Sequence, residues 1–324
     1  MSVSFAIGAA TDVGRLREVN QDSFLATDGL AVVADGMGGH RGGEVASAIA
    51  VTTLRQSFGE ATVDSLTAGV AEANGDIRAR SVAEPDLHGM GTTLCALAII
   101  EEKGVEKLAI VNVGDSRAYV LLDNRLHQIT EDHSLVEALV REGRLTREEA
   151  DTHPQRNIVT RALGAADSVE VDQFLIEPMG QARFLLCSDG LFNEIDDAEI
   201  ADLLGSIADP SRAAQALVEA ANNEGGRDNI TAVVVDVHSD AAGEESSDIE
   251  ATAEVPVVAS TEQIAAEPRW ASDIEAGDDD RGDSAKGDAG EGATGDGAAS
   301  DDEAEEAGGA SSGSERRRWW RSAT

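Results

Sequence analysis

The amino-acid sequence predicts an α+β fold of four layers, in which two antiparallel β-sheets pack face to face and a pair of helices covers each outer side. Short apolar runs typical of strands are joined by hairpin signals, of which Asp28-Gly29 is the clearest, and hairpins make antiparallel neighbours. Two separate pairs of amphipathic segments with helical spacing can each cover one sheet. A helix, sheet, sheet, helix sandwich is the economical way to bury these apolar surfaces.

The first elements lie around two Asp-Gly pairs with different surroundings. Strands are expected at 24–26 and 30–33, on either side of Asp28-Gly29, which therefore serves as a structural turn. Asp35-Gly36 leads instead into a glycine-rich loop that opens a helix. The two helices expected after this loop span 43–57 and 63–82.

A meander of strands follows, and the rest of the domain alternates between loops, strands and helices. Residues 133–165 combine short helical signals with irregular loop. The strands expected in the meander lie at 92–100, 107–113, 117–122 and 126–129. The later elements expected are strands at 169–176, 183–187 and 230–237 and helices at 197–204 and 211–222.

The composition changes near residue 239 of the 324. From Ser239 onward the chain is dominated by Ala, Gly, Ser, Asp and Glu, and it carries 23 acidic and 7 basic residues, about −16 of the total charge of −37. Low hydrophobicity with high net charge is typical of disorder, because little apolar surface is available to offset chain entropy. The sequence therefore predicts a domain over 1–238 and an acidic disordered tail over 239–324 with a basic and aromatic end, RRRWWR.

The strong acidic balance argues against nucleic acid and anionic membrane as partners, since both would repel the chain. Cys95 and Cys187 lie inside apolar runs and are expected to be buried thiols without a disulfide. The first residues lack the basic and apolar regions of a signal peptide, and no stretch reaches the roughly 18 apolar residues of a membrane helix. We expect a cytoplasmic protein.

Five aspartates carry the chemical signal, because each stands where an apolar run ends in a turn of small residues. One such aspartate is ordinary turn chemistry, but carboxylates gathered from five strand ends repel one another unless a cation holds them. Hard oxygen ligands of this kind suit magnesium or manganese, and a glycine lets a backbone carbonyl approach the ion. The candidate ligands are Asp22, Asp35, Asp115, Asp189, Asp228 and the carbonyl of Gly36.

An ordered set of motifs carries a resemblance to a known family: RxxNQDS, ADGMGGHRGGEVAS, GMGTT, VGDSRAY, ITEDHS, HPxRNxxTRALG, CSDGL and GRDNITAVVV. The chain resembles the metal-dependent protein serine/threonine phosphatases of type 2C, the PPM class, and within it the bacterial branch that opposes serine/threonine kinases. The match covers roughly residues 4–238. The resemblance implies a sandwich of two antiparallel sheets flanked by helices, in agreement with the layers deduced above.

The resemblance also implies how the ligands are shared between two Mn2+ or Mg2+ ions. Asp35 would bridge both ions. Asp22 and the carbonyl of Gly36 would serve one of them, and Asp189 and Asp228 the other. These assignments follow from the family's motifs and apply to the matching positions of this chain.

Further site residues follow from the same motifs. Asp115, with Asp189, would serve a third ion, and Arg17 would grip the substrate phosphate with its planar fork. His40 matches a proton donor to the leaving alcohol, although it could equally cap the following helix or orient a water. His133 is expected to anchor a flap over 130–165. Gln21 stands where several relatives carry an acid, which leaves one ion with fewer carboxylates.

The activity implied is hydrolysis of phosphoserine and phosphothreonine monoesters in proteins by a metal-activated water, without a phosphoenzyme. The partners implied are phosphorylated proteins, among them serine/threonine kinases and their substrates. We expect the protein itself to be a monomer. Two alternatives stay open: a phosphatase of small phosphate esters and a non-catalytic phosphoprotein-binding module. Residues 38–43 lack the Gly-Lys-Ser/Thr ending of a nucleotide loop, and no GxSxG elbow makes Ser134 a nucleophile.

Overall fold

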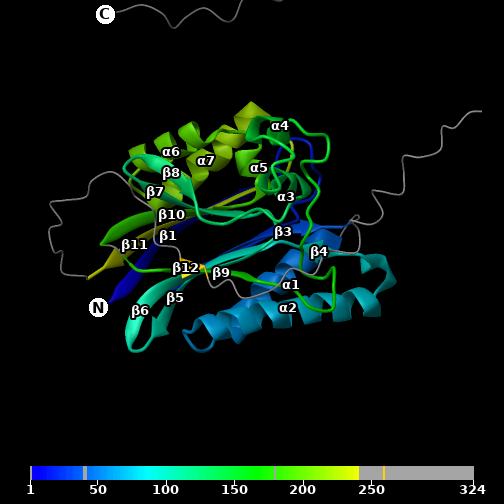
Figure 1. Ribbon diagram of the computed structural model, residues 1–324, viewed down its shortest axis with the longest axis horizontal. Helices are drawn as coiled ribbons and strands as arrows, with labels where there is room; N and C mark the ends of the chain where they lie inside the picture. The colour runs from blue at the N-terminus through cyan, green and yellow to red at the C-terminus, as the bar shows by residue number, and fades with distance from the viewer. Residues whose placement is uncertain (1, 39–41, 179, 241–257, 260–324) are drawn as a thin grey trace, which may run out of the picture. The chain divides into compact units, whose positions relative to one another are not determined.

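The computed structural model describes residues 2–38, 42–178, 180–240 and 258–259 and confirms the four-layer α+β sandwich. In Figure 1 the layers succeed one another as helices, sheet, sheet and helices. The first sheet has the strand order β1-β11-β10-β7-β8, and each neighbouring pair is antiparallel. Its strands are β1 (Val3–Asp12), β7 (Arg117–Leu122), β8 (Arg125–Gln128), β10 (Gln181–Cys187) and β11 (Ile230–Ser239).

The second sheet has the order β12-β9-β6-β5-β3-β2, with β4 paired to the end of β3. All of its pairings are antiparallel as well, and the β2–β3 hairpin turns at Asp28-Gly29 as the sequence predicts. Its strands are β2 (Asp22–Thr27), β3 (Leu30–Met37), β4 (Gly91–Thr92), β5 (Leu94–Glu102), β6 (Val105–Val113), β9 (Asp172–Ile176) and β12 (Val258–Ala259).

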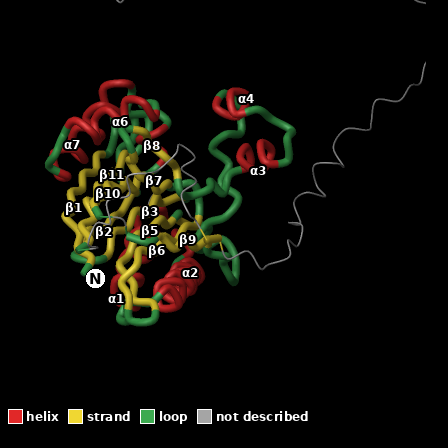
Figure 2. Tube along the Cα trace, turned by 60° about the vertical axis from the view of Figure 1, so that its left-hand side comes forward, coloured by secondary structure: helices red, strands yellow, loops and turns green. Residues whose placement is uncertain are grey.

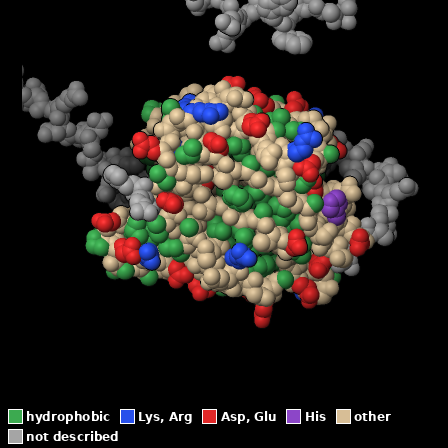
Figure 3. Space-filling model, turned by 180° about the vertical axis from the view of Figure 1, so that it is seen from behind, with side chains coloured by type: hydrophobic (Ala, Val, Ile, Leu, Met, Phe, Trp, Pro, Cys, Tyr) green, Lys and Arg blue, Asp and Glu red, His purple; other side chains and the backbone are tan. Residues whose placement is uncertain are grey.

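Helices cover the outer faces of both sheets, while two short helices stand apart from them. Figure 2 shows α3 and α4 held away from the sheets on loops, at the end of the molecule where β7 and β9 also reach. On the face seen in Figure 3, acidic side chains are scattered widely and basic ones are few. In the described part of the chain, no helix is long and apolar enough to cross a bilayer. The helices are α1 (Gly42–Ser57), α2 (Val63–Ala83), α3 (Leu135–Arg141), α4 (Arg147–Asp151), α5 (Asp189–Phe192), α6 (Asp197–Ser206) and α7 (Pro210–Glu224), with a 3₁₀ turn at Pro85–Leu87.

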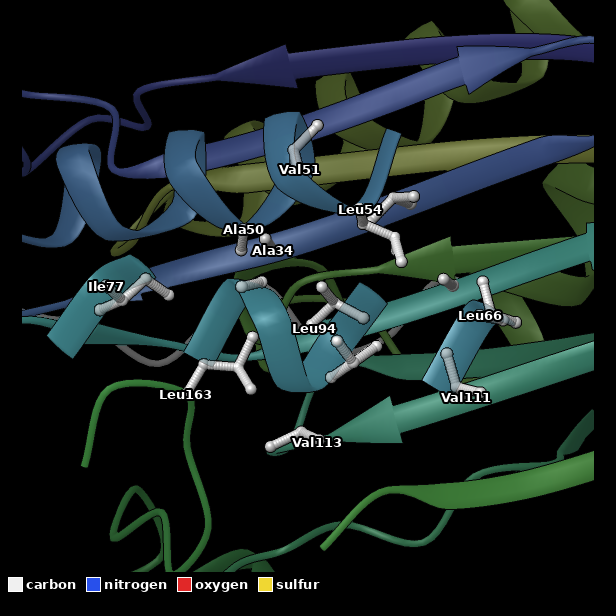
Figure 4. Packing of buried hydrophobic residues seen from close by; sticks show 14 of the residues in the cluster. Ala34, Ala50, Val51, Leu54, Leu66, Ile77, Leu94, Val111, Val113 and Leu163 are labelled. Carbon is white, nitrogen blue, oxygen red and sulfur yellow. The ribbon is translucent and has the colours of Figure 1, made fainter. Parts of the chain in front are cut away.

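Strand β3 shows why the two sheets share one interior. Its side chains alternate between the faces, so Val32 and Ala34 pack toward α1 and α2 while Ala31 and Val33 pack toward the other sheet. Because both faces are covered, the strand reads as one continuous apolar run. Figure 4 shows the first of these clusters, in which Ala50 of α1 lies beside Ala34 of β3 and Leu54 lies further along the same helix.

The helix starts follow from polar caps in the sequence. Asp196 caps α6 and Asp209 caps α7, each accepting a hydrogen bond from the backbone N–H three residues later. Pro210 occupies the first position of α7, where its missing N–H costs no helical hydrogen bond. Thr62 caps α2 in the same way, because its side chain accepts a hydrogen bond from the Ser65 N–H. These caps fix where the outer layers begin.

The structure adds elements that the sequence analysis did not anticipate. Strand β1 pairs with β11 along its whole length, although only part of Val3–Asp12 is buried, so its apolar signal is weak. The short α5 follows β10 directly. Beyond the predicted boundary at 238, Ser239 ends β11, and Val258–Ala259 forms a two-residue strand against β9. Apart from Asp240, the rest of the predicted tail lies outside the described residues.

Candidate metal centre

The fold brings the five candidate aspartates to one end of the sandwich. Asp22 and Asp35 face each other in the register of the β2–β3 hairpin. Asp189 is the first residue of α5 after β10, and Asp228 lies just before β11; both strands belong to the sheet that faces this hairpin. Asp115 lies in the loop that passes from β6 of one sheet to β7 of the other. Both sheets therefore contribute carboxylates to the same place.

Asp22 is held by hydroxyl groups of the opposite sheet. Its Oδ2 accepts hydrogen bonds from the Ser188 hydroxyl and the Thr231 hydroxyl, both at 2.7 Å. Its Oδ1 is buried and has no hydrogen-bond partner among the described residues. A buried oxygen without a partner costs free energy unless a donor or a cation meets it. Of the two carboxylate oxygens of Asp22, Oδ1 is therefore the one left free to bind an ion.

Asp35 is fixed through its backbone. Its N–H donates to the Thr93 hydroxyl at 2.9 Å, and its carbonyl accepts from the Thr93 N–H and the Thr92 hydroxyl. The charges of Asp22 and Asp189 act on its side chain, and each disfavours its ionised form.

Crowding perturbs the protonation of the carboxyls. Removal from water raises the pKa of Asp22 to about 7, that of Asp115 to about 7 and that of Asp189 to about 6. The same removal from water, reinforced first by the charge of Asp22, raises the pKa of Asp35 well above its ordinary range. The carboxyls repel one another, so the cluster is unfavourable as a set of bare anions.

A divalent cation fits this donor set. It would neutralise the repelling carboxylates and meet the orphan Oδ1 of Asp22. Across the described ranges, no group of three acidic, histidine or cysteine side chains is arranged to hold a metal ion as it stands. A bound Mg2+ would keep part of its water shell, as it usually does in proteins.

Gly36 lies where no side chain could fit. A Cβ at this position would come within 2.1 Å of the Gly43 carbonyl and 2.5 Å of the Gln21 carbonyl. The Gly36 N–H donates to that same Gln21 carbonyl at 3.2 Å. The glycine thus lets the start of α1 and the end of β3 approach closely beside Asp35. The predicted use of its carbonyl as a ligand stays a prediction.

Arg17 reaches the centre from the loop before β2. Its Nη2 donates to Oδ2 of Asp228 at 2.7 Å, and the guanidinium side chain stays 52% exposed. Asn229 holds the neighbouring backbone, because its Oδ1 accepts from the Gln21 N–H and its amide donates to two carbonyls of the Arg17 loop. The predicted phosphate-binding arginine is therefore beside the carboxylates and accessible.

Arg117 and its partners lie beside the carboxylates, and the sequence analysis did not identify them. The guanidinium grips the Asp132 carboxylate with two nitrogens, at 2.9 and 2.7 Å, and lies 3.6 Å from the centre of the Phe192 ring. It is a positive charge next to Asp115 and Asp189, and it acts to lower the pKa of both carboxyls. Arg117 directly follows the GDS motif, which was the available signal.

A cavity of about 380 Å³ opens beside the carboxylates, with Asp115 and Asp189 in its wall. The opposite wall comes from the predicted flap, so the flap lies where the sequence analysis expected it. Arg147 pairs with Glu137 and Arg227 with Glu194. Arg156 is exposed and makes no ion pair within the described ranges. Arg156 therefore brings an unpaired positive charge to the cavity, whereas Arg147 and Arg227 are balanced by their glutamate partners.

Two predicted histidines have different outcomes. His133 is buried at the base of the flap and hydrogen-bonds on both ring nitrogens, in keeping with the anchor that was expected. His40 lies outside the described residues, and its predicted role stays a prediction.

A larger hollow of about 710 Å³ lies between α1 and α2, but none of the five aspartates lines it.

Comparison with known proteins identifies the family. Residues 15–255 match the family described as protein phosphatase 2C. The serine/threonine phosphatase stp of Listeria monocytogenes is 42% identical over 240 residues, which cover 70% of this chain and 93% of that protein. The serine/threonine protein phosphatase PstP of Mycobacterium tuberculosis is 42% identical over 233 residues, 71% of this chain and 44% of that protein.

Solved structures agree with the fold. The crystal structure of the Mycobacterium tuberculosis phosphatase PstP/Ppp superposes with a TM-score of 0.68 at 41% identity, covering 73% of this chain and all of that one. A PstP catalytic domain in complex with two manganese ions gives 0.66 at 39% identity, covering 74% of this chain and all of that one. The resemblance drawn from the motifs is confirmed, and the chain belongs to the protein phosphatase 2C family.

Proposed function

We propose that the chain hydrolyses phosphoserine and phosphothreonine monoesters in proteins, with Mn2+ or Mg2+ as cofactor. The observation that carries this proposal is the meeting of five aspartates, drawn from both sheets, beside an accessible arginine and an arginine-bearing cavity. Such a cluster suits divalent ions, and a phosphate ester is the anion that those ions and arginines together would bind.

The ligands follow the predicted assignment. Asp35 would bridge two ions, with Asp22 and the carbonyl of Gly36 on one side and Asp189 and Asp228 on the other. Asp115 would contribute to a third ion. The related PstP domain in complex with two manganese ions supports the first two of these ions. When bound, the ions lower the pKa of a coordinated water and polarise the phosphate, which makes hydrolysis possible at neutral pH.

The chain's own residues would bind and orient the substrate. Arg17 can leave its exposed contact with Asp228, once an ion neutralises that carboxylate, and turn both guanidinium nitrogens toward the phosphate oxygens. Arg117 stays locked on Asp132, so it supplies a fixed positive potential behind Asp115. The Ser188 and Thr231 hydroxyls hold Asp22 in place through the reaction.

The partners we propose are phosphorylated proteins, among them serine/threonine kinases and their substrates. The relatives' names, which specify serine/threonine phosphatases, support this class of substrate. The cavity beside the carboxylates is bounded by the flap and is open to solvent, so a peptide segment can enter it. We propose that the protein acts as a monomer in the cytoplasm, where its two buried thiols, Cys95 and Cys187, stay reduced.

A substrate comparison tests this proposal. The protein would be assayed with Mn2+ on phosphothreonine peptides, on a phosphorylated kinase domain and on small phosphate esters. The proposal expects the highest kcat/KM on the protein and peptide substrates and no turnover in a metal chelator. A higher kcat/KM on small esters would favour a metabolite phosphatase. Binding of phosphopeptides without turnover in any metal would favour the non-catalytic module.

A further inference from the structure

His133 joins the flap to the loop that carries Asp115. Its ring is buried, and Nδ1 accepts a hydrogen bond from the Gly114 N–H at 2.9 Å. The His133 N–H in turn donates to the Gly114 carbonyl at 3.0 Å. Two hydrogen bonds thus hold the peptide units on either side of Gly114, which directly precedes Asp115.

The other ring nitrogen faces an ion pair. Because Nδ1 accepts, the proton of the neutral imidazole is on Nε2, which donates to Oδ2 of Asp172 at 3.0 Å. Nη1 of Arg161 donates to Oδ1 of the same carboxylate at 2.6 Å and also lies 2.9 Å from Nε2 of His133. Removal from water opposes ionisation of Asp172, but the bonds from His133 and Arg161 prevail and lower its pKa. The imidazole is therefore fixed at both ends.

These contacts span both stems of the flap. The His133 carbonyl accepts from the Thr160 N–H at 2.8 Å, and Ser134 forms a bridge with Val159. Ser134 then caps α3, so the flap begins immediately after the histidine. Arg161 leaves the second stem and reaches Asp172 at the end of β9. A movement of the flap would therefore displace His133 through these hydrogen bonds.

Gly114 is placed so that a displacement of His133 also displaces Asp115, the next residue in the chain. Its φ is +104°, and a Cβ there would come within 2.6 Å of the Thr93 side chain. The Thr93 hydroxyl also accepts from the Asp35 N–H and bonds the Ser116 hydroxyl. The loop is thus clamped between the histidine on one side and the residue that fixes Asp35 on the other.

We propose that His133 is a latch, a positioning residue that couples the flap to the metal-binding carboxylate Asp115. One ring nitrogen holds the Asp115 loop through Gly114, and the other ties that loop to the flap stem through Asp172 and Arg161. The proposal rests on the proposed function for its meaning, since it makes ion binding at Asp115 depend on where the flap lies. Partners that orient a metal ligand typically change metal affinity by about 10- to 100-fold when removed.

Two substitutions separate the two ends of the latch. His133→Asn keeps an acceptor near the Gly114 N–H and loses the reach to Asp172. His133→Gln keeps a donor toward Asp172 and loses the acceptor at Nδ1. Asp172→Asn tests the flap side without touching the histidine. His127→Asn is the matched control, because His127 is exposed on β8 and its side chain makes no hydrogen bond within the described part of the chain.

The readouts are Mn2+ titration by calorimetry and hydrogen exchange of the backbone, neither of which needs turnover. His133→Gln is expected to weaken the lowest-affinity Mn2+ site by about tenfold and to raise exchange at 113–116. His133→Asn and Asp172→Asn are expected to raise exchange over 131–161 while changing Mn2+ affinity less. His127→Asn is expected to change neither quantity.

Outcomes that overturn the latch differ from those that overturn the proposed function. Wild-type Mn2+ affinity and wild-type exchange in both His133 variants, with circular dichroism showing folded protein, would disprove the coupling. A uniform rise of exchange over the whole domain would show a merely structural histidine and would equally disprove it. Failure of the wild-type protein to hydrolyse any phosphopeptide would refute the proposed function and leave these two measurements able to decide the latch.

Discussion

The interior between the two sheets and the carboxylate end of the same sheets differ in what they do to stability. Between the sheets, Leu97, Ile110 and Phe184 are withdrawn from water and meet only apolar neighbours, so their burial favours the folded state. At the carboxylate end, Asp22 and Asp35 are also withdrawn from water, but they meet like charges. The same pair of sheets thus carries a stabilising middle and a destabilising end, and the end stays folded because the middle is strong.

The largest effect is expected for Asp35→Asn, with Asp228→Asn as a second test. Either change removes a charge that the ions require, so activity should fall by about 10²- to 10³-fold or more. The metal-free Asp35→Asn protein should nevertheless have a higher Tm than the wild type, because an amide carries neither the buried charge nor the cost of taking up a proton. Phosphopeptide kinetics and calorimetry measure the two effects. Activity near that of the wild type would refute the two-ion assignment.

Ile110→Ala should have the opposite signature. Ile110 is fully buried between the sheets, so its truncation should lower the free energy of unfolding by about 2–5 kcal/mol. The rate per folded molecule should stay unchanged, since the side chain lies away from the carboxylates. Urea unfolding and kinetics on the folded fraction check both statements. A loss of Mn2+ affinity comparable to the loss of stability would show that the two regions are not separable.

The same contrast explains what the sequence could predict. The apolar strands were recognisable because burial on both faces imposes a continuous apolar run, and β7 begins and ends where it was expected, at Arg117 and Leu122. Strand β1 was missed because its outer positions are only partly buried. Turn residues located each aspartate at a strand end.

The sequence alone could not predict contacts between residues that lie far apart in the chain. The Arg17–Asp228 pair and the His133–Asp172 bond depend on strand pairing and register, which bring together side chains far apart in sequence. The hydroxyls of Ser188 and Thr231 on Asp22 are of the same kind. Residue type and spacing predicted which groups do chemistry, whereas their hydrogen-bond partners required the fold.

The metal-free protein should lose stability as the pH rises from about 4 to about 7. The folded-state pKa values of Asp22, Asp115 and Asp189 lie above the unfolded value of 3.8, so in this window the folded state holds protons that the unfolded state has released. Raising the pH removes those protons and restores the repulsion. A fall in Tm of about 5 °C, corresponding to roughly 2 kcal/mol, is expected by calorimetry in chelator.

Excess Mn2+ should reverse this dependence, because the ion binds the ionised carboxylates more tightly as the pH rises. Asp22→Asn is the informative variant, since it removes one of the raised pKa values and should flatten the curve in chelator. A metal-free Tm that rises steadily between pH 4 and pH 7 would contradict the assigned charge cluster.

The smallest effect is expected for Arg17→Ala, which tests whether this arginine belongs to the substrate or to the metal centre. Its contact with Asp228 is 52% exposed on the arginine side and 37% on the aspartate side, so the pair adds little to stability. We expect KM for a phosphothreonine peptide to rise by about tenfold with Mn2+ affinity unchanged. Arg17→Lys should recover only part of the loss, because an ammonium keeps the charge but not the planar fork.

Arg55→Ala, at an exposed arginine in the last turn of α1, is the matched control. If Arg17→Ala instead weakened Mn2+ binding and left KM unchanged, the arginine would serve to orient Asp228, and the phosphate would have to be bound by other groups.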